Sequence, residues 1–202
     1  MNIKSITAIS LISIGALSIG WTMAQDNEKE TTAIETKVST TIQSPLTQDR
    51  INAYYKEADK VQTQEMEALK SWLQDHIHED ADIEMNVNLN IEEYDVKDRV
   101  QESFLDKYLL IQDNVDSYKV AKTEMVETTI ESFTLSEDGK IATVKLINKS
   151  RAKSFGDEAK NKSPLLITSK GKCTDELTMT DSIIQLLKRS CKLNTEAFAT
   201  KP

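Results

Sequence analysis

Apolar and polar residues alternate without exception over residues 82–91. Asp, Glu or Asn fills the positions between the apolar side chains. The apolar positions are Ile83, Met85, Val87, Leu89 and Ile91. A period of two is typical of a strand with one buried face, whereas a helix would scatter these residues around its circumference. We therefore predict a β-strand over 82–91.

A helical pattern precedes this strand. Apolar residues recur over 51–76 at spacings of three, four or eight, which fit a period of 3.6 residues. The stripe consists of Ile51, Tyr54, Ala58, Val61, Leu69, Trp72 and His76. Ser44 and Pro45 mark its expected start, because serine caps free amides and proline tolerates the first helical position. The stripe thins near Thr63, so either one helix reaches Ile77 or two helices meet at a break.

A second helix is predicted after the strand, followed by two hairpins. Asp95 is expected to cap this helix. Its apolar side would consist of Val96, Val100, Phe104, Tyr108, Ile111 and Val115. In the first hairpin, residues 123–135 pair with 141–147, because Asp138-Gly139 accommodates the left-handed backbone of a tight turn. A polar loop is expected over 149–164, and the second hairpin is expected to pair 165–179 with 183–193.

The N-terminus has the pattern of a secretory signal peptide. Lys4 is the only charged residue among the first 25, an apolar run follows over 6–20, and Thr22-Met23-Ala24 supplies small residues for cleavage after Ala24. A membrane anchor is the alternative, but the run is shorter than the roughly 20 residues that a spanning helix needs. We predict a signal peptide over 1–24, a flexible threonine-rich leader over 25–43 and a single α+β domain over 44–202. The mature protein is expected in the periplasm or outside the cell, without a stable membrane anchor.

Composition excludes several classes of function. The 202 residues include 25 Lys and Arg against 33 Asp and Glu, for a formal net charge of −8, which argues against nucleic-acid binding. With two cysteines, two histidines and five glycines, the chain has no thiol redox motif and no glycine-rich phosphate loop. We expect no cofactor and no metal.

The two cysteines, Cys173 and Cys191, are expected to form a structural disulfide in an exported protein. An antiparallel register that places them opposite each other also creates favourable cross-strand pairs. These pairs are Asp175 with Arg189, Glu176 with Lys188, and Leu177 with Leu187. We expect the ion pair of Asp175 and Arg189 to be exposed. The alternative is a short helix over 181–191 that Asp181 would cap.

A helical start followed by a curved antiparallel sheet resembles the nuclear transport factor 2-like (NTF2-like) superfamily, which includes ketosteroid isomerase and polyketide cyclases. The resemblance covers about residues 45–195. It includes the segment 118–144, and the pairing of 172–177 with 187–191 looks like exported members with a bridged final hairpin. It implies an α+β fold whose N-terminal helices pack on a curved, mainly antiparallel sheet that forms a cone. Enzymes, binding modules and assembly domains all use this fold.

The resemblance implies that an enzyme of this fold would hold an acid or base inside the cone. Conceivable cone residues are Asp175, Tyr54, Tyr108 and Tyr118. We expect no carboxylate within an apolar strand face, where burial would raise its pKa for proton transfer. A second cluster contains metal-ligand types, namely His76, His78, Glu79, Asp80 and Asp82. Histidines two residues apart point in different directions on a helix, so a solvated helix end is favoured over a metal site.

Cations are concentrated over residues 145–172, which hold eight Lys and Arg against two acidic residues. Lys149, Arg151 and Lys153 form the expected anion-facing patch, which would steer an anionic partner. The alternative is a solvated strand-and-loop edge, where lysines prevent edge-to-edge pairing.

We predict an exported, non-catalytic binding or assembly module of the bacterial envelope or medium. Its partner would be an unknown protein or a small apolar ligand. The alternative is a small isomerase- or cyclase-like enzyme that uses an acid in the cone. A large apolar cavity with an unpaired carboxylate would favour the enzyme, and a cone filled by side chains would favour the module.

Overall fold

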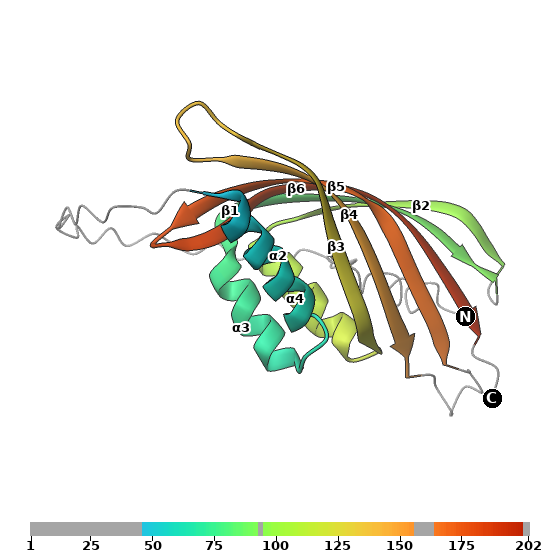
Figure 1. The fold of residues 1–202 in the computed structure, drawn as a ribbon. Helices are drawn as coiled ribbons and strands as arrows, with labels where there is room; N and C mark the ends of the chain where they lie inside the picture. Colours follow the sequence, from blue (N-terminus) through green and yellow to red (C-terminus); the bar gives the residue numbers. More distant parts are fainter. Residues whose placement is uncertain (1–45, 93–94, 156–163, 200–202) are drawn as a thin grey trace, which may run out of the picture.

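Three helices lie on one face of a six-stranded sheet in the computed structural model, which describes residues 46–92, 95–155 and 164–199 (Figure 1). The helices are α2 (Gln48–Val61), α3 (Met66–His76) and α4 (Lys107–Tyr118). The strands are β1 (Ile77–Ile91), β2 (Val96–Leu105), β3 (Ala121–Leu135), β4 (Ala142–Ser154), β5 (Leu165–Thr180) and β6 (Ile183–Ala199). The sheet order is β2-β1-β6-β5-β4-β3, and β1 with β6 is its one parallel pair. Figure 1 shows the sheet arching over the helices, which confirms the predicted α+β fold with a curved, mainly antiparallel sheet.

The helical stripe of the sequence forms two helices, with the break at the predicted place. α2 ends at Val61 and α3 begins at Met66. The side chain of Thr47 caps α2 by accepting a hydrogen bond from the backbone N–H of Arg50 at 3.4 Å. The expected helix start at Ser44-Pro45 lies outside the described residues.

The predicted strand over 82–91 is confirmed, but it begins earlier, at Ile77. Its five alternating apolar residues are all buried beneath the helices. Ile77 pairs with Leu186 of β6, so parallel pairing extends the strand back to the end of α3. Helix and strand therefore follow each other with no loop between them.

The predicted helix over 96–115 is wrong in its first half. Residues 96–105 form β2, which pairs antiparallel with β1, and the helix α4 begins only at Lys107. Asp106, rather than Asp95, is the capping residue, and its Oδ1 accepts from the backbone N–H of Leu109 at 2.8 Å. The spacing of apolar residues suited a helix, but the strand instead pairs with the edge of β1 between Ile83 and Ile91 and satisfies backbone groups there.

The first hairpin joins β3 and β4 through the predicted turn. Gly139 has a φ of 69°, which glycine adopts without steric cost. The predicted polar loop over 149–164 is wrong at its start, because β4 continues to Ser154 and pairs with β3 and β5 on its two sides. Residues 156–163 lie outside the described part of the chain.

The second hairpin, β5–β6, confirms most of the register read from the cysteines. Cys173 lies opposite Cys191, and the residues of the two predicted charge pairs also lie opposite each other. Leu177 pairs with Leu186 rather than Leu187, because the register shifts by one residue after Glu176. Positive φ angles at the turn residues Asp181 and Ser182 match a two-residue hairpin turn. The helical alternative over 181–191 is therefore wrong.

Candidate functional sites inside the cone and on the outer face

The inner face of the sheet carries a buried carboxylate, contrary to the sequence expectation. Asp175 lies on β5 between two buried apolar neighbours, Cys173 and Leu177, and its exposed fraction is 0%. Arg189, directly opposite on β6, is also buried, with an exposed fraction of 5%. The expectation of an exposed ion pair is therefore wrong, since both residues point toward the helices.

Both carboxylate oxygens of Asp175 accept hydrogen bonds. Arg189 donates from Nε to Oδ1 at 2.8 Å and from Nη2 to Oδ2 at 2.5 Å. The hydroxyl of Tyr55, from α2, donates to Oδ2 at 2.7 Å. A bidentate guanidinium contact is the strongest arrangement for this pair, and it satisfies a charge that would otherwise be costly to bury.

A chain of aromatic rings continues from this ion pair toward the edge of the cone. Tyr54 packs edge-on against Tyr55, with ring centroids 5.1 Å apart and an interplanar angle of 80°. Trp72 lies 5.4 Å from Tyr54 and stacks on His76 at 4.4 Å. The Nδ1 of His76 lies 2.8 Å from the carbonyl oxygen of Ile184 in β6, so α3 is tied to the hairpin end of the sheet.

Burial and charge perturb the ionisable groups of this cluster. Burial raises the pKa of Tyr54 and that of Tyr55 well above the ordinary value of a phenol. Burial alone would lower the pKa of Arg189, but the adjacent Asp175 carboxylate outweighs it and the pKa is raised. Both tyrosines are therefore neutral, and the guanidinium charged, across the physiological range.

Little free space remains in the cone. Tyr54, Trp72 and Arg189 help to line a cavity of about 30 Å³ between the helices and the sheet. That is room for about two water molecules. A wider groove of about 440 Å³ lies between α2 and β3, and Tyr55 forms part of its wall. Because the Tyr55 hydroxyl is bonded to Asp175, this side chain separates the groove from the carboxylate.

The other predicted cone residues have different surroundings. Tyr108 is 72% exposed at the start of α4, outside the cone. Tyr118 donates its hydroxyl hydrogen to the carbonyl oxygen of Gln64 at 2.6 Å, which links α4 to the turn before α3. Sequence reasoning missed Tyr55 as a partner of Asp175, because it lies beside Tyr54 on the helix and nothing in the sequence says which ring reaches the sheet.

The histidine and carboxylate cluster is dispersed. His76 is at the end of α3, whereas His78, Glu79 and Asp82 lie on β1. Glu79 accepts from Lys107 Nζ at 2.6 Å, and this hydrogen bond lowers the pKa of Glu79. Within residues 46–92, 95–155 and 164–199, no group of His, Cys, Asp and Glu is arranged to hold a metal ion.

The predicted anion-facing patch lies on the outer face of a strand, not in a loop. Lys149, Arg151 and Lys153 alternate on β4 with inward-facing buried residues. Lys149 lies 3.6 Å from Glu127 and Arg151 lies 3.2 Å from Glu124, so β3 partly neutralises two of the three cations. Strands β5 and β6 add further cations to the same face, which only the register reveals.

The disulfide between Cys173 and Cys191 is present, with the Cα atoms 4.1 Å apart. Both cysteines face the helices and are buried. The bridge therefore joins β5 and β6 two residues along each strand from the Asp175–Arg189 pair, beneath the same helices.

Solved structures similar to this chain share little sequence with it and have TM-scores below 0.5. An NTF2-like protein of unknown function from Prochlorococcus sp. NATL2A is 12% identical, with a TM-score of 0.44 over 78% of this chain and 96% of that one. An NTF2-like protein from Cytophaga hutchinsonii is 11% identical, with a TM-score of 0.45 over 73% and 98%. A ketosteroid isomerase-like protein from Erwinia carotovora atroseptica is 8% identical, with a TM-score of 0.39 over 75% and 93%.

No family model matches the chain, and neither does any curated protein. The predicted fold-level resemblance to NTF2-like proteins is confirmed, since helices pack inside a curved, mainly antiparallel sheet as expected, with β2 added to the predicted order of elements. None of the described helices is long and apolar enough to cross a membrane.

Proposed function

We propose that the protein is an exported, non-catalytic binding or assembly module. The proposal rests on the interior of the cone, where the buried carboxylate of Asp175 is engaged in hydrogen bonds and the free volume is small. Two carboxylates are buried among the described residues, Asp113 on α4 and Asp175 on β5. Asp175 lies on the inner face of the sheet and is held by Arg189 and Tyr55. A proton-transfer acid needs a free oxygen facing the substrate, and a substrate needs more room than about 30 Å³.

The Asp175 cluster is better suited to stabilising the fold. It joins α2 to both strands of the final hairpin through three hydrogen bonds. The same hairpin carries the disulfide, which is compatible with an oxidising compartment outside the cytoplasm. The cone interior thus works as a rigid support, and binding is left to the outer surfaces.

An activity assay tests the non-catalytic part of the proposal. The exported protein and its Asp175→Asn variant are given a β,γ-unsaturated ketone, whose isomerisation requires an acid or base in the cone. We expect both proteins to leave the buffer rate unchanged. Turnover by the parent that disappears in Asp175→Asn would contradict the proposal and establish the isomerase alternative.

Export is tested separately by mass spectrometry. The protein recovered from outside the cytoplasm should begin at Gln25, because cleavage is expected after Ala24. A full-length chain retained in the membrane would contradict export. The signal peptide and leader, residues 1–43, lie outside the described residues, so this measurement is their direct test.

A further inference from the structure

The outer face of the sheet concentrates positive charge on three neighbouring inner strands, β4, β5 and β6. Residues of β4, β5 and β6 that face away from the helices include eight cations and two carboxylates. The cations, which we call the basic strip, are Lys145, Lys149, Arg151, Lys153, Lys170, Lys172, Lys188 and Lys192. The carboxylates are Glu176 and Glu196. The whole chain has a net charge of −8, so its composition does not account for this face.

Several cations of the strip are forced close together by strand pairing. Lys149 lies directly opposite Lys170, and Lys172 lies directly opposite Lys192. Neighbouring strands are about 4.8 Å apart, and like charges in such positions destabilise a sheet. The fold thus tolerates two unfavourable pairs in adjacent rows.

Protection of a sheet edge does not explain these lysines. The edges of the sheet are β2 and β3, whereas β4, β5 and β6 have a paired strand on each side. An inner strand has no free backbone for another chain to extend. The edge explanation considered for the sequence is therefore wrong for this face.

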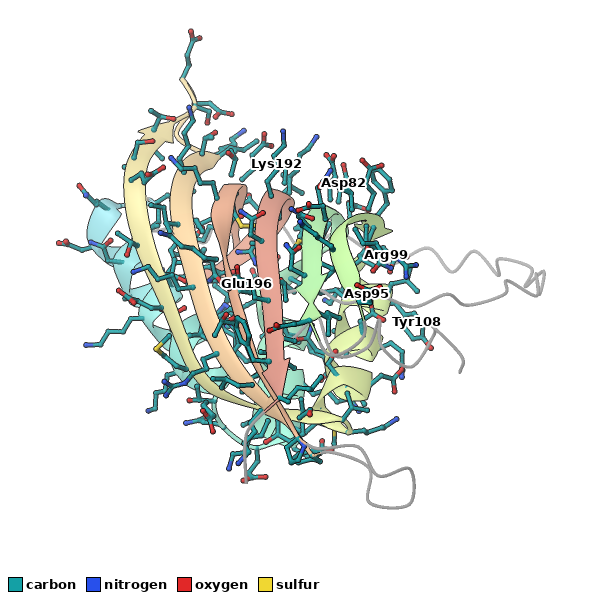
Figure 2. The ribbon with its side chains drawn as sticks, turned by 90° about the vertical axis from the view of Figure 1, so that its right-hand side faces the viewer. Asp82, Asp95, Arg99, Tyr108, Lys192 and Glu196 are labelled. Atoms are coloured by element: carbon teal, nitrogen blue, oxygen red, sulfur yellow. A yellow bond between two sulfur atoms is a disulfide. The ribbon has the colours of Figure 1, made fainter. Side chains whose placement is uncertain are left out.

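Acidic residues border the strip and pair with part of it, but two cations near its centre have no acidic partner. On the β3 side, Glu131 contacts Lys172 at 3.3 Å, as Glu127 and Glu124 contact β4. On the other side, Asp82 of β1 lies 3.7 Å from Lys188. Figure 2 labels Asp82 of β1 and Lys192 of β6 toward the upper end of the sheet in this view, and Glu196 lower down. Lys170 and Lys192 are exposed and have no salt-bridge partner within the described part of the chain.

We infer that the basic strip is the docking surface for an acidic, extended segment of a partner protein. This inference rests on the proposed role as a binding module and names its partner class. Alternate residues of an extended chain are about 6.6 Å apart, the same spacing as Lys170 and Lys172 or Lys149 and Arg151 along their strands. Carboxylates at every second position of the partner therefore match the cations in register.

The borders of the strip favour a narrow partner over a wide one. A lipid surface or a nucleic acid duplex is wide enough to meet the acidic borders on β1 and β3 as well as the strip. The outer face is also convex, so that a flat membrane would touch only part of it (Figure 1). An extended segment that runs along β5, with β4 and β6 on its two sides, avoids both borders.

The test compares two variants with the same change in net charge. Lys170→Glu/Lys192→Glu reverses the centre of the strip, and Lys56→Glu/Lys97→Glu reverses two exposed lysines elsewhere. A labelled peptide of alternating Glu and Ser is titrated with each full-length protein, and its anisotropy is measured. At a salt concentration of about 0.1 M we expect the strip variant to bind about tenfold more weakly than the parent, and the control variant to match the parent.

Other outcomes overturn the inference in recognisable ways. Equal weakening in both variants would mean that net charge alone governs binding. Strip-dependent binding to vesicles of phosphatidylglycerol, without binding to the peptide, would identify a membrane instead. A dimer that dissociates in the strip variant would identify a second copy of this chain. None of these results affects the non-catalytic proposal, which fails only if the protein turns over a substrate in the cone.

Discussion

Arg189→Met should be among the most destabilising single substitutions in this protein. It removes both guanidinium hydrogen bonds to Asp175 and leaves a carboxylate whose exposed fraction is 0%, with only the Tyr55 hydroxyl as a partner. Breaking a buried ion pair from one side typically costs about 3–5 kcal/mol. That is a large share of the 5–15 kcal/mol by which proteins are usually stable.

The assay is equilibrium unfolding in urea at neutral pH. The free energies of unfolding of the parent and the variant are compared with the same slope against urea concentration. A triple replacement serves as control: Tyr55→Phe, Asp175→Leu and Arg189→Met remove the whole polar cluster together. Since no group is then left unpaired, most of the loss should be regained. A cost below about 1 kcal/mol for Arg189→Met alone would mean that the pair is solvated, as an exposed ion pair is, and would refute the buried cluster.

Three further changes follow from the same structure. Cys191→Ser should lower the free energy of unfolding by about 3 kcal/mol, because the bridge closes a loop with a sequence separation of 18; a fully stable variant with one free thiol would contradict this. Gly171→Ala should cost about 1–3 kcal/mol in urea unfolding, since the added Cβ would overlap the backbone of Lys192, whereas an unchanged midpoint would show that β5 and β6 can separate there. Stability should fall as pH rises above about 10, because the unfolded chain can ionise Tyr54 and Tyr55 while the folded chain, with their pKa values raised, cannot. Tyrosinate absorbance should therefore appear for these two rings only on unfolding, and early ionisation of all five tyrosines of the chain would refute their burial.

Elements with one buried face could be predicted from the sequence. In β1 each apolar residue alternates with a polar one, and in β5–β6 the cysteines and charges select a single register. β2 could not be predicted, because an edge strand exposed on both faces loses its alternation, and Val96, Val100 and Phe104 happened to recur at a helical spacing. Residues 96–105 form a strand because they pair with β1, and a pattern within the segment itself does not show this pairing.

The site residues show the same division. The register correctly predicted that Asp175 lies opposite Arg189. It did not predict that both side chains are buried, because charged residues were expected to point into solvent. The alternation of Asp175 with Cys173 and Leu177 was the available signal for burial. The basic strip required the order of the strands, since only β4 and β6 lying beside β5 bring Lys149 and Lys192 next to Lys170 and Lys172.

Fluorescence of Trp72 tests the central claim most directly. Trp72 lines the cone cavity, and the only other tryptophan, Trp21, belongs to the expected signal peptide. The exported protein is titrated with a steroid ketone, and the emission of Trp72 is followed in the parent and in Asp175→Asn. A cone filled by side chains predicts no saturable change in either protein. Saturable binding that responds to Asp175→Asn would show an open cone with a working carboxylate, and would contradict the account.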